Sequence, residues 1–507
     1  MLVFAMFVPC GLKARLLRES GPCPPMSKIL RRLFSSSRIR FLETPSVNAP
    51  RAVPDLRSVR SDVGLFEENV KIRNYKQHEN HPRRITELAE LSSQAKRSSL
   101  EPRKKLKSLQ KTLAAIGSER RKQDVLPQIN ELQAEVDRLD QEASSYDRLA
   151  RDLALSLPNL TSSHTPLNGE PKILSYINYD SANPPQYAST AHHSAIGQKL
   201  DLLDFTSSSA TSGWGFYYLL NEAALLEQAL VQYALSVAMR HGWKVVTPPS
   251  LVYSHIADAC GFQPRDQNGE QQIWQVAQPE RDIGKPKRSL AATAEIPFAG
   301  LHANKDIKEE YLPVKVIGPS RCYRAEAGAR GVDTRGLYRV HEFTKVEMFA
   351  WTDSPTPAAD KLEEAELTRH STQVFDEMVK IQIEMLSSLG LPCRVLEMPS
   401  TDLGASAYRK IDIEAMFPSR QSRDEGWGEV TSVSICTDYQ SRRLNTKIEE
   451  RSGARKKFPH TVNGTAVAVP RVLAAILENG WREEEGCVII PEVLRPYIGG
   501  LQKIGPR

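Results

Sequence analysis

The sequence predicts an α+β protein in which a long helical hairpin precedes a larger part made of strands and helices. Three observations indicate this fold class. Segments 85–116 and 129–153 carry apolar residues three and four positions apart, which is the seam of a coiled coil. Segment 321–351 holds two alternating runs around a turn-rich stretch, which is typical of a β-hairpin. Further amphipathic helices and strand-like runs surround that hairpin in the sequence.

The length and composition limit the number of domains, the class of protein and its possible partners. A chain of 507 residues is expected to form two or three units, and 40% hydrophobic with 25% charged residues is typical of globular proteins. The net charge of +6 permits a nucleic-acid partner. The seven cysteines show no CxxC or Cys/His spacing, so we expect reduced thiols and no structural zinc. The longest apolar run, Met1–Val8, is too short to span a bilayer, so we expect no membrane partner.

Residues 1–45 have the composition of a mitochondrial targeting segment. Eight lysines and arginines face a single acid, Glu19, before Glu43, and serines lie among them. A secretory signal is the first alternative, but there the charges precede the apolar run, whereas here they follow it. A disordered basic tail is the second alternative. We expect import into the mitochondrial matrix.

Residues 46–165 are predicted to hold a linker followed by a helical arm. The start of this region is rich in Pro, Arg and Ser, which is typical of a linker, and 66–75 suits a short helix at the base of the arm. Pro102 should kink or interrupt the first long helix. The chain could reverse at Gly117 and Ser118, and the two helices would then pack antiparallel.

The end of the first long helix and the turn after it are strongly basic. Lysines and arginines on a rigid rod suit recognition of nucleic-acid shape and phosphates, whereas a solvated helix face is the alternative. The candidate nucleic-acid contacts are Arg103, Lys104, Lys105, Lys107, Lys111, Arg120, Arg121 and Lys122.

The 321–351 hairpin gathers groups that suit a nucleotide together with an amino acid. Arg324 and Glu326 are two positions apart in a strand-like run and would share a face. The odd positions of the second run also share a face and are Arg339, Phe343, Lys345 and Glu347. Guanidinium forks fit phosphate oxygens, an aromatic ring stacks on a base, and a carboxylate holds an ammonium group.

This hairpin resembles motif 2 of the class II aminoacyl-tRNA synthetases, and its RxE followed by RVHEFTKVE is similar to the seryl-tRNA synthetase form. Other segments resemble that family's motifs in the same order. The helix and strand at 219–249 resemble motif 1, the dimer interface, and Thr293-Ala294-Glu295 is similar to the TxE element. EVTSVSICTDYQSRR, at 429–443, resembles the EVxSxSNCxDFQxRR strand, and 460–471 resembles motif 3.

The resemblance implies an architecture and a reaction. Residues 166–507 would form a class II catalytic domain, a mostly antiparallel β-sheet flanked by helices, and the arm would bind tRNA. The protein would be a homodimeric serine–tRNA ligase of mitochondrial translation. It would use ATP and Mg²⁺ to activate L-serine as seryl-adenylate, and would transfer the seryl group to the 3′ end of tRNA(Ser).

The resemblance also implies roles for individual residues. The catalytic residues would be Arg324, Arg471 and Glu429. ATP would be bound by Arg324, Glu326, Arg339, Phe343, Glu429, Ser432 and Arg471. Serine would be bound by Thr293, Glu295, Glu347, Asn463 and Thr465, and Mg²⁺ by Glu429 and Ser432.

Two alternatives stay open at this level. Ile435 stands where the family usually has Asn, and losing an amide near the pocket would suit a catalytically inactive, dimeric tRNA-binding relative. A class II enzyme for threonine or proline is the other alternative, disfavoured by the missing zinc-ligand spacing and by the helical arm. A class I synthetase is a poor fit because the chain has no HxGH.

Overall fold

The computed structural model describes residues 49–115, 119–167, 169–187, 189–262, 272–325, 336–355, 363–451, 453 and 456–506. Several predicted features lie outside the described residues. They are the targeting segment, the turn at Gly117 and Ser118, the side chains of Arg120, Arg121 and Lys122, and Glu326.

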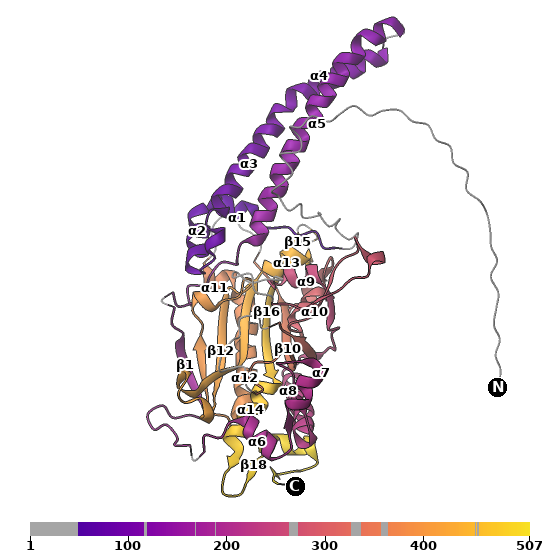
Figure 1. Ribbon diagram of the computed structural model, residues 1–507. Helices are drawn as coiled ribbons and strands as arrows, with labels where there is room; N and C mark the ends of the chain where they lie inside the picture. Colours follow the sequence, from indigo (N-terminus) through magenta and orange to yellow (C-terminus); the bar gives the residue numbers. More distant parts are fainter. Residues whose placement is uncertain are drawn as a thin grey trace, which may run out of the picture. The chain divides into compact units, whose positions relative to one another are not determined.

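The predicted helical arm is present. It consists of α3 (His81–Ser98), α4 (Leu100–Ala115) and α5 (Glu119–Ser156), with α5 lying beside the other two (Figure 1). Ion pairs join Lys96 to Asp147 and Arg103 to Asp140. A later residue on the α3–α4 side of the arm thus pairs with an earlier residue of α5, so the helices are antiparallel, as predicted.

Proline and the apolar seam explain the ends of the arm's helices. The first long helix is interrupted between Ser98 and Leu100, as predicted, because Pro102 in the first turn of α4 has no N–H to bond the carbonyl of Ser98. The predicted start of the second helix at position 129 was wrong, because α5 begins at Glu119. Val125 packs against the same cluster as Ile129 and extends the seam by one turn.

The base of the arm is bonded to the rest of the chain. Two short helices, α1 (Leu56–Ser61) and α2 (Val63–Ile72), precede α3, and α2 is the short helix predicted near 66–75. The buried guanidinium of Arg73 donates hydrogen bonds to the carbonyls of Asn159, Leu403, Gly404 and Ala407. Removing a charge with so many buried partners would leave several carbonyls unsatisfied.

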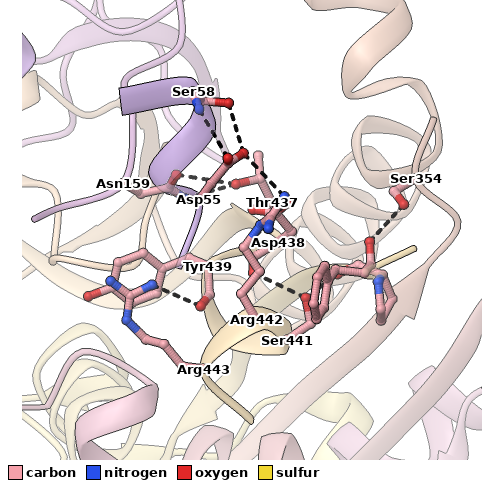
Figure 2. Close-up of polar contacts among 12 residues, drawn as sticks. Asp55, Ser58, Asn159, Ser354, Thr437, Asp438, Tyr439, Ser441, Arg442 and Arg443 are labelled. Carbon is pink, nitrogen blue, oxygen red and sulfur yellow. Dashed lines mark hydrogen bonds and ion pairs between the residues drawn. The ribbon is translucent and has the colours of Figure 1, made fainter. Parts of the chain in front are cut away.

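A second set of contacts links the arm to the end of strand β13 (Trp427–Thr437) and to helix α13 (Tyr439–Leu444) (Figure 2). The Asn159 amide donates to the Cys436 carbonyl at 2.8 Å and to the hydroxyl of Thr437 at 3.0 Å. Arg443 donates to the carbonyl of Leu155 at 3.0 Å. These bonds connect the last turn of α5 to α13, and the residues just after α5 to β13, a strand that also lines the cavity described below.

Within the described residues, eight strands form the main sheet in the order β1-β11-β12-β13-β16-β10-β9-β4. Neighbours are antiparallel except β4 and β9, which confirms the mostly antiparallel sheet. The strands not yet given are β1 (Lys172–Ile177), β4 (Lys244–Val245), β9 (Val314–Tyr323), β10 (Glu342–Thr352), β11 (Cys393–Glu397), β12 (Arg409–Met416) and β16 (His460–Ala468). The predicted hairpin is β9–β10, in which Tyr323 pairs with Glu342.

Alternation along the strands gives the sheet two different faces. Val346 and Met348 of β10 pack with apolar residues of α8 (Asn221–Arg240), α12 (Arg369–Ser388) and α14 (Val469–Gly480). Phe349 and Trp351 belong to a second cluster on the other face. Helix α8 confirms the helix predicted within 219–249, and α14 begins at Val469 with Pro470, which suits the first turn of a helix.

The other α-helices and β-strands of the described chain are short. They are α6 (His193–Lys199), β2 (Leu203–Asp204), α7 (Thr206–Ser212), β3 (Tyr218–Leu219), β5 (Leu251–Tyr253), α9 (Ser254–Ala259), β6 (Gln275–Val276), β7 (Arg288–Leu290), α10 (Glu295–Gly300), β8 (Asp306–Lys308), α11 (Glu364–Leu367), β14 (Lys447–Glu449), β15 (Lys456–Lys457), β17 (Trp481–Arg482), β18 (Cys487–Ile489) and β19 (Lys503–Ile504). None of the described helices is both long and apolar enough to cross a membrane.

Candidate active site

A cavity opens beside the β9–β10 hairpin and is closed by β13, β16 and the first turn of α14. It holds about 520 Å³ of space that no atom fills, part of which is open to solvent. Its described lining residues are Arg324, Tyr338, Arg339, Val340, Phe343, Lys345, Glu429, Val430, Thr431, Ser432, Thr465, Ala468, Pro470 and Arg471. Six of the seven residues expected to bind ATP therefore line one cavity, and Glu326 is outside the described residues.

The hairpin contributes a guanidinium and an aromatic ring. Arg324 directly follows β9, and its guanidinium carbon lies 5.3 Å from the centroid of the Phe343 ring on β10. The Arg324 Nε donates to the carbonyl of Ala292 at 3.4 Å, which leaves the two terminal nitrogens to face other groups. A positive fork next to an aromatic ring suits a nucleotide, since the fork fits phosphate oxygens and the ring can stack on a base.

Helix α14 and strand β13 contribute the opposite wall. Arg471 donates from Nη1 to the Glu429 carboxylate at 2.9 Å and from Nε to the carbonyl of Tyr338 at 3.1 Å. Burial opposes the charge of Glu429, but Arg471 and Lys410 outweigh it and lower the pKa of Glu429 to about 2. The carboxylate is therefore ionised at neutral pH.

Glu429 and Ser432 line the same wall of the cavity. An ionised carboxylate and a hydroxyl are oxygen donors, which Mg²⁺ prefers. The residues present therefore fit the cation that the sequence motifs imply.

A second group of polar side chains lies deeper, around Glu295 at the start of α10. One Glu295 carboxylate oxygen accepts from Gln440 at 2.6 Å and from Asn463 at 3.2 Å. The Thr293 hydroxyl accepts from the backbone N–H of Glu295 at 3.2 Å. Burial, and next the negative charge of Glu347, raise the pKa of Glu295 to about 8. Glu295 therefore holds a proton at neutral pH.

Glu347 forms the other half of this group. Its carboxylate pairs with the Lys345 ammonium at 2.6 Å and accepts from the Thr465 hydroxyl at 3.2 Å. Both charged side chains are almost fully buried, with 7% of Lys345 and 2% of Glu347 exposed. Lys345 and Thr465 also line the main cavity, so the carboxylate group and the nucleotide-like wall are continuous. All five residues expected to bind serine lie in this group.

The raised pKa of Glu295 predicts a pH-dependent stability. Between about pH 4, where a carboxyl ionises in an unfolded chain, and about pH 8, the folded chain keeps a proton that the unfolded chain releases. The free energy of unfolding should therefore fall with rising pH more steeply for the wild type than for Glu295→Gln. The glutamine keeps an acceptor for Gln440 and Asn463 and does not ionise. Urea unfolding across this pH range tests the difference, and parallel curves would contradict it.

Several residues of the site were missed from the sequence. Tyr338 lies between two guanidiniums, with Arg471 at 4.7 Å and Arg420 at 4.3 Å from its ring centroid. Gln440 lies in the 429–443 motif, but no role was predicted for it. Lys345 was placed on the strand face of Glu347 but given no partner, although opposite charges two positions apart on one face can pair, as they do here.

Ile435 lies away from the cavity. It is 1% exposed and packs in the cluster formed by the sheet and helices α8, α12 and α14. Its neighbour Cys436 points the other way, and its sulfur accepts from the Asn463 amide at 3.3 Å. The aliphatic side chain is therefore a core residue, and it removes no polar group from the described lining of the site.

Comparison with known proteins agrees with this geometry. Residues 280–480 match the family model for the tRNA synthetase class II core domain (G, H, P, S and T). The mitochondrial serine–tRNA ligase of Saccharomyces cerevisiae is 37% identical over 484 residues, which cover 94% of this chain and 100% of the yeast protein. The chain belongs to the seryl-tRNA synthetases. The mitochondrial serine–tRNA ligase of Schizosaccharomyces pombe is 42% identical over 345 residues, covering 68% of this chain and 67% of that protein.

Solved seryl-tRNA synthetases share the fold. The Pyrococcus horikoshii enzyme complexed with ATP superposes with a TM-score of 0.77 at 27% identity, covering 90% of this chain and all of that one. The cytoplasmic serine–tRNA ligase of Naegleria fowleri in complex with AMP gives 0.71 at 28% identity, with the same coverage. This seryl-tRNA synthetase is thus a class II ligase of mitochondrial type. The alternatives of an inactive relative and of an enzyme for threonine or proline are not supported.

Proposed function

We propose that the cavity beside the β9–β10 hairpin carries out both steps of serine–tRNA ligation in the mitochondrial matrix. The observation that supports this most strongly is the continuity of the site. A guanidinium-rich wall suited to ATP and a carboxylate group suited to an amino acid meet at Lys345 and Thr465. The two reactants of serine activation would therefore lie side by side, which supplies the positioning that this reaction needs.

In the first step, a serine carboxylate oxygen attacks the α-phosphorus of ATP and pyrophosphate leaves, so that a mixed anhydride forms. Arg324 would hold the α-phosphate, where negative charge develops, and Phe343 would stack on the adenine. Glu326 would contact the adenine amino group. Arg339 and Arg471 would hold the β/γ end, where the leaving group forms.

Glu429 and Ser432 would hold Mg²⁺, whose charge neutralises part of the phosphate charge. The low pKa of Glu429 suits this role, because the carboxylate stays ionised over the whole physiological pH range.

Serine recognition would use the polar group around Glu295 and Glu347. The Glu347 carboxylate would hold the serine ammonium. Thr293, Glu295, Asn463 and Thr465 would surround the ammonium and the hydroxyl. In the second step, a ribose hydroxyl at the 3′ end of tRNA(Ser) attacks the seryl carbonyl. The ester forms, the acyl–phosphate bond breaks, and AMP leaves.

The functional division we propose follows the sequence. Residues 1–45 would direct import, 46–165 would include the arm that grips tRNA, and 166–507 would form the catalytic domain. A homodimer built on the motif 1 segment is part of the proposal. Leu225 and Met239 on α8 and Val245 on β4 are 54%, 57% and 45% exposed, so this segment has apolar side chains that a second copy could cover. Sedimentation equilibrium of the purified protein should give the mass of two chains, and the mass of one chain would contradict the homodimer.

The arm's cations give a prediction that separates the two steps. In the described structure Arg103 pairs with Asp140 and Lys104 with Glu101, whereas Lys105, Lys107 and Lys111 are exposed on α4. Changing these last three to alanine should raise the KM for tRNA(Ser) by about 10-fold or more at low salt, because phosphate contacts are lost. Serine-dependent ATP–pyrophosphate exchange, which needs no tRNA, should stay at the wild-type rate. Equal losses in both assays would contradict the arm's role.

A further inference from the structure

A buried histidine outside the cavity connects two of its walls. His193, the first residue of α6, is 2% exposed. Its Nδ1 lies 2.7 Å from the Glu478 carboxylate in the second half of α14, and its Nε2 accepts from the backbone N–H of Leu337 at 2.9 Å. Leu337 and Tyr338 lie between the two strands of the motif 2 hairpin, and α14 carries Arg471 at its start.

The hydrogen bonds define how the imidazole is used. A backbone N–H only donates, so Nε2 must accept from Leu337, and the proton therefore sits on Nδ1 and is donated to Glu478. Glu478 also accepts from the backbone and hydroxyl of Ser419. Burial opposes its charge, but the hydrogen bond from His193 and the others keep the pKa of Glu478 below its usual value. Although His192, His193 and Glu478 lie close together, both nitrogens of His193 are occupied, so this cluster is not a metal site.

The same helix therefore holds one short segment at two points. Near its start, Arg471 donates to the Tyr338 carbonyl at 3.1 Å and lies 4.7 Å from the Tyr338 ring centroid. Two turns later, Glu478 holds the imidazole that accepts from Leu337. Leu337 is fully buried, so its N–H has no water to replace that acceptor.

Gly336 shows how closely this segment approaches the histidine. Its φ of +80° is in the left-handed region that favours glycine. A Cβ at this position would lie 2.2 Å from His193 Nε2 and 2.9 Å from the His192 ring. Any other residue would therefore push the segment off the imidazole.

We propose that His193 is a positioning residue for the nucleotide wall of the cavity. By accepting from Leu337, it fixes Tyr338 and Arg339 in register with Arg471, so that the β/γ-phosphate contacts are assembled before ATP binds. This inference rests on the proposed function of the cavity. His193 would thereby act in ATP binding although it does not line the cavity that would hold ATP and serine.

Two isosteric variants separate this role from simple anchoring of α14. His193→Asn places an amide nitrogen near Nδ1, so the bond to Glu478 is kept and Leu337 loses its acceptor. His193→Gln places a carbonyl oxygen near Nε2, so Leu337 keeps its acceptor and the bond to Glu478 is lost. Loss of one buried bond predicts that His193→Asn raises the KM for ATP in serine-dependent exchange by about 10-fold, with the KM for serine unchanged. His193→Gln should stay within about 3-fold of the wild type for both substrates, since the positioning bond is kept.

Hydrogen exchange gives a readout that does not depend on activity. The amides of residues 336–341 should exchange faster in His193→Asn than in the wild type and in His193→Gln. A larger ATP defect in His193→Gln, or equal defects in the two variants, would overturn the inference and make His193 a structural anchor only. A wild-type chain without serine-dependent exchange would overturn the proposed function, and the hydrogen-exchange order of the variants would still decide the positioning role.

Discussion

Replacing Arg324 by alanine is expected to lower serine-dependent ATP–pyrophosphate exchange by about 10²–10³-fold, the usual effect of removing one donor to a developing charge. The guanidinium lines the cavity, lies 5.3 Å from the Phe343 ring, and uses only its Nε on the backbone. The loss should fall mainly on kcat, because charge on the α-phosphoryl group increases in the transition state. Arg324→Lys should recover only part of the rate, since an ammonium lacks the planar fork.

Arg288→Ala is the matched control for Arg324→Ala. Arg288 is an exposed arginine on β7 and does not line the cavity. Its removal should leave exchange unchanged, and thermal unfolding of both variants should resemble that of the wild type. If Arg324→Ala kept near-normal exchange, or lost no more than Arg288→Ala, the assignment of the phosphate wall would be wrong.

The buried pair of Lys345 and Glu347 carries the second large expectation. Glu347→Gln removes one partner of an ion pair that is 7% and 2% exposed, so the free energy of unfolding should fall by about 3–5 kcal/mol. Serine activation should be lost as well, because the carboxylate proposed for the serine ammonium is gone. Urea unfolding and ATP–pyrophosphate exchange measure the two effects separately.

A double variant separates stability from recognition. Replacing a buried ion pair by apolar residues of similar size is often neutral for stability. Lys345→Met combined with Glu347→Leu should therefore regain most of the stability lost in Glu347→Gln but none of the serine-dependent exchange. If the double variant regained exchange with stability, Glu347 would be a structural residue and not part of the serine site.

Local patterns in the sequence predicted those parts of the fold that depend on neighbouring residues. The heptad seam predicted the arm because Ile129 and Val136 face the partner helix, and Pro102 predicted its interruption. Alternation predicted the β9–β10 hairpin and the shared face of Phe343 and Lys345. The start of α5 was predicted ten residues too late, since residues 119–124 are all polar or charged and carry no apolar periodicity.

The serine-side group could not be obtained from spacing. Glu295, Glu347, Gln440 and Asn463 come from four distant segments, and they meet only because β16 lies between β13 and β10. The strand order depends on packing across the whole domain, which periodicity does not encode. The motif resemblance, by contrast, named three of these four residues.

Contacts that pass through backbone groups were the hardest to anticipate. The hydrogen bond from Leu337 to His193 joins residues 144 positions apart, and one partner is a main-chain N–H that carries no sequence signal. Arg73 at the base of the arm likewise bonds only carbonyls. Such residues look unremarkable in the sequence and are recognised only when the fold places their partners.

The most direct test of the account is ATP–pyrophosphate exchange by the purified chain from residue 46 onward, with serine, alanine and threonine compared. A pocket that bonds the serine hydroxyl should reject alanine by about 10⁴-fold, because its buried polar groups would otherwise be left unpaired. Threonine should be excluded by its extra methyl group. Exchange driven by serine alone is the predicted result. A folded chain that shows no exchange, or that activates alanine as well as serine, would contradict the assignment of this cavity.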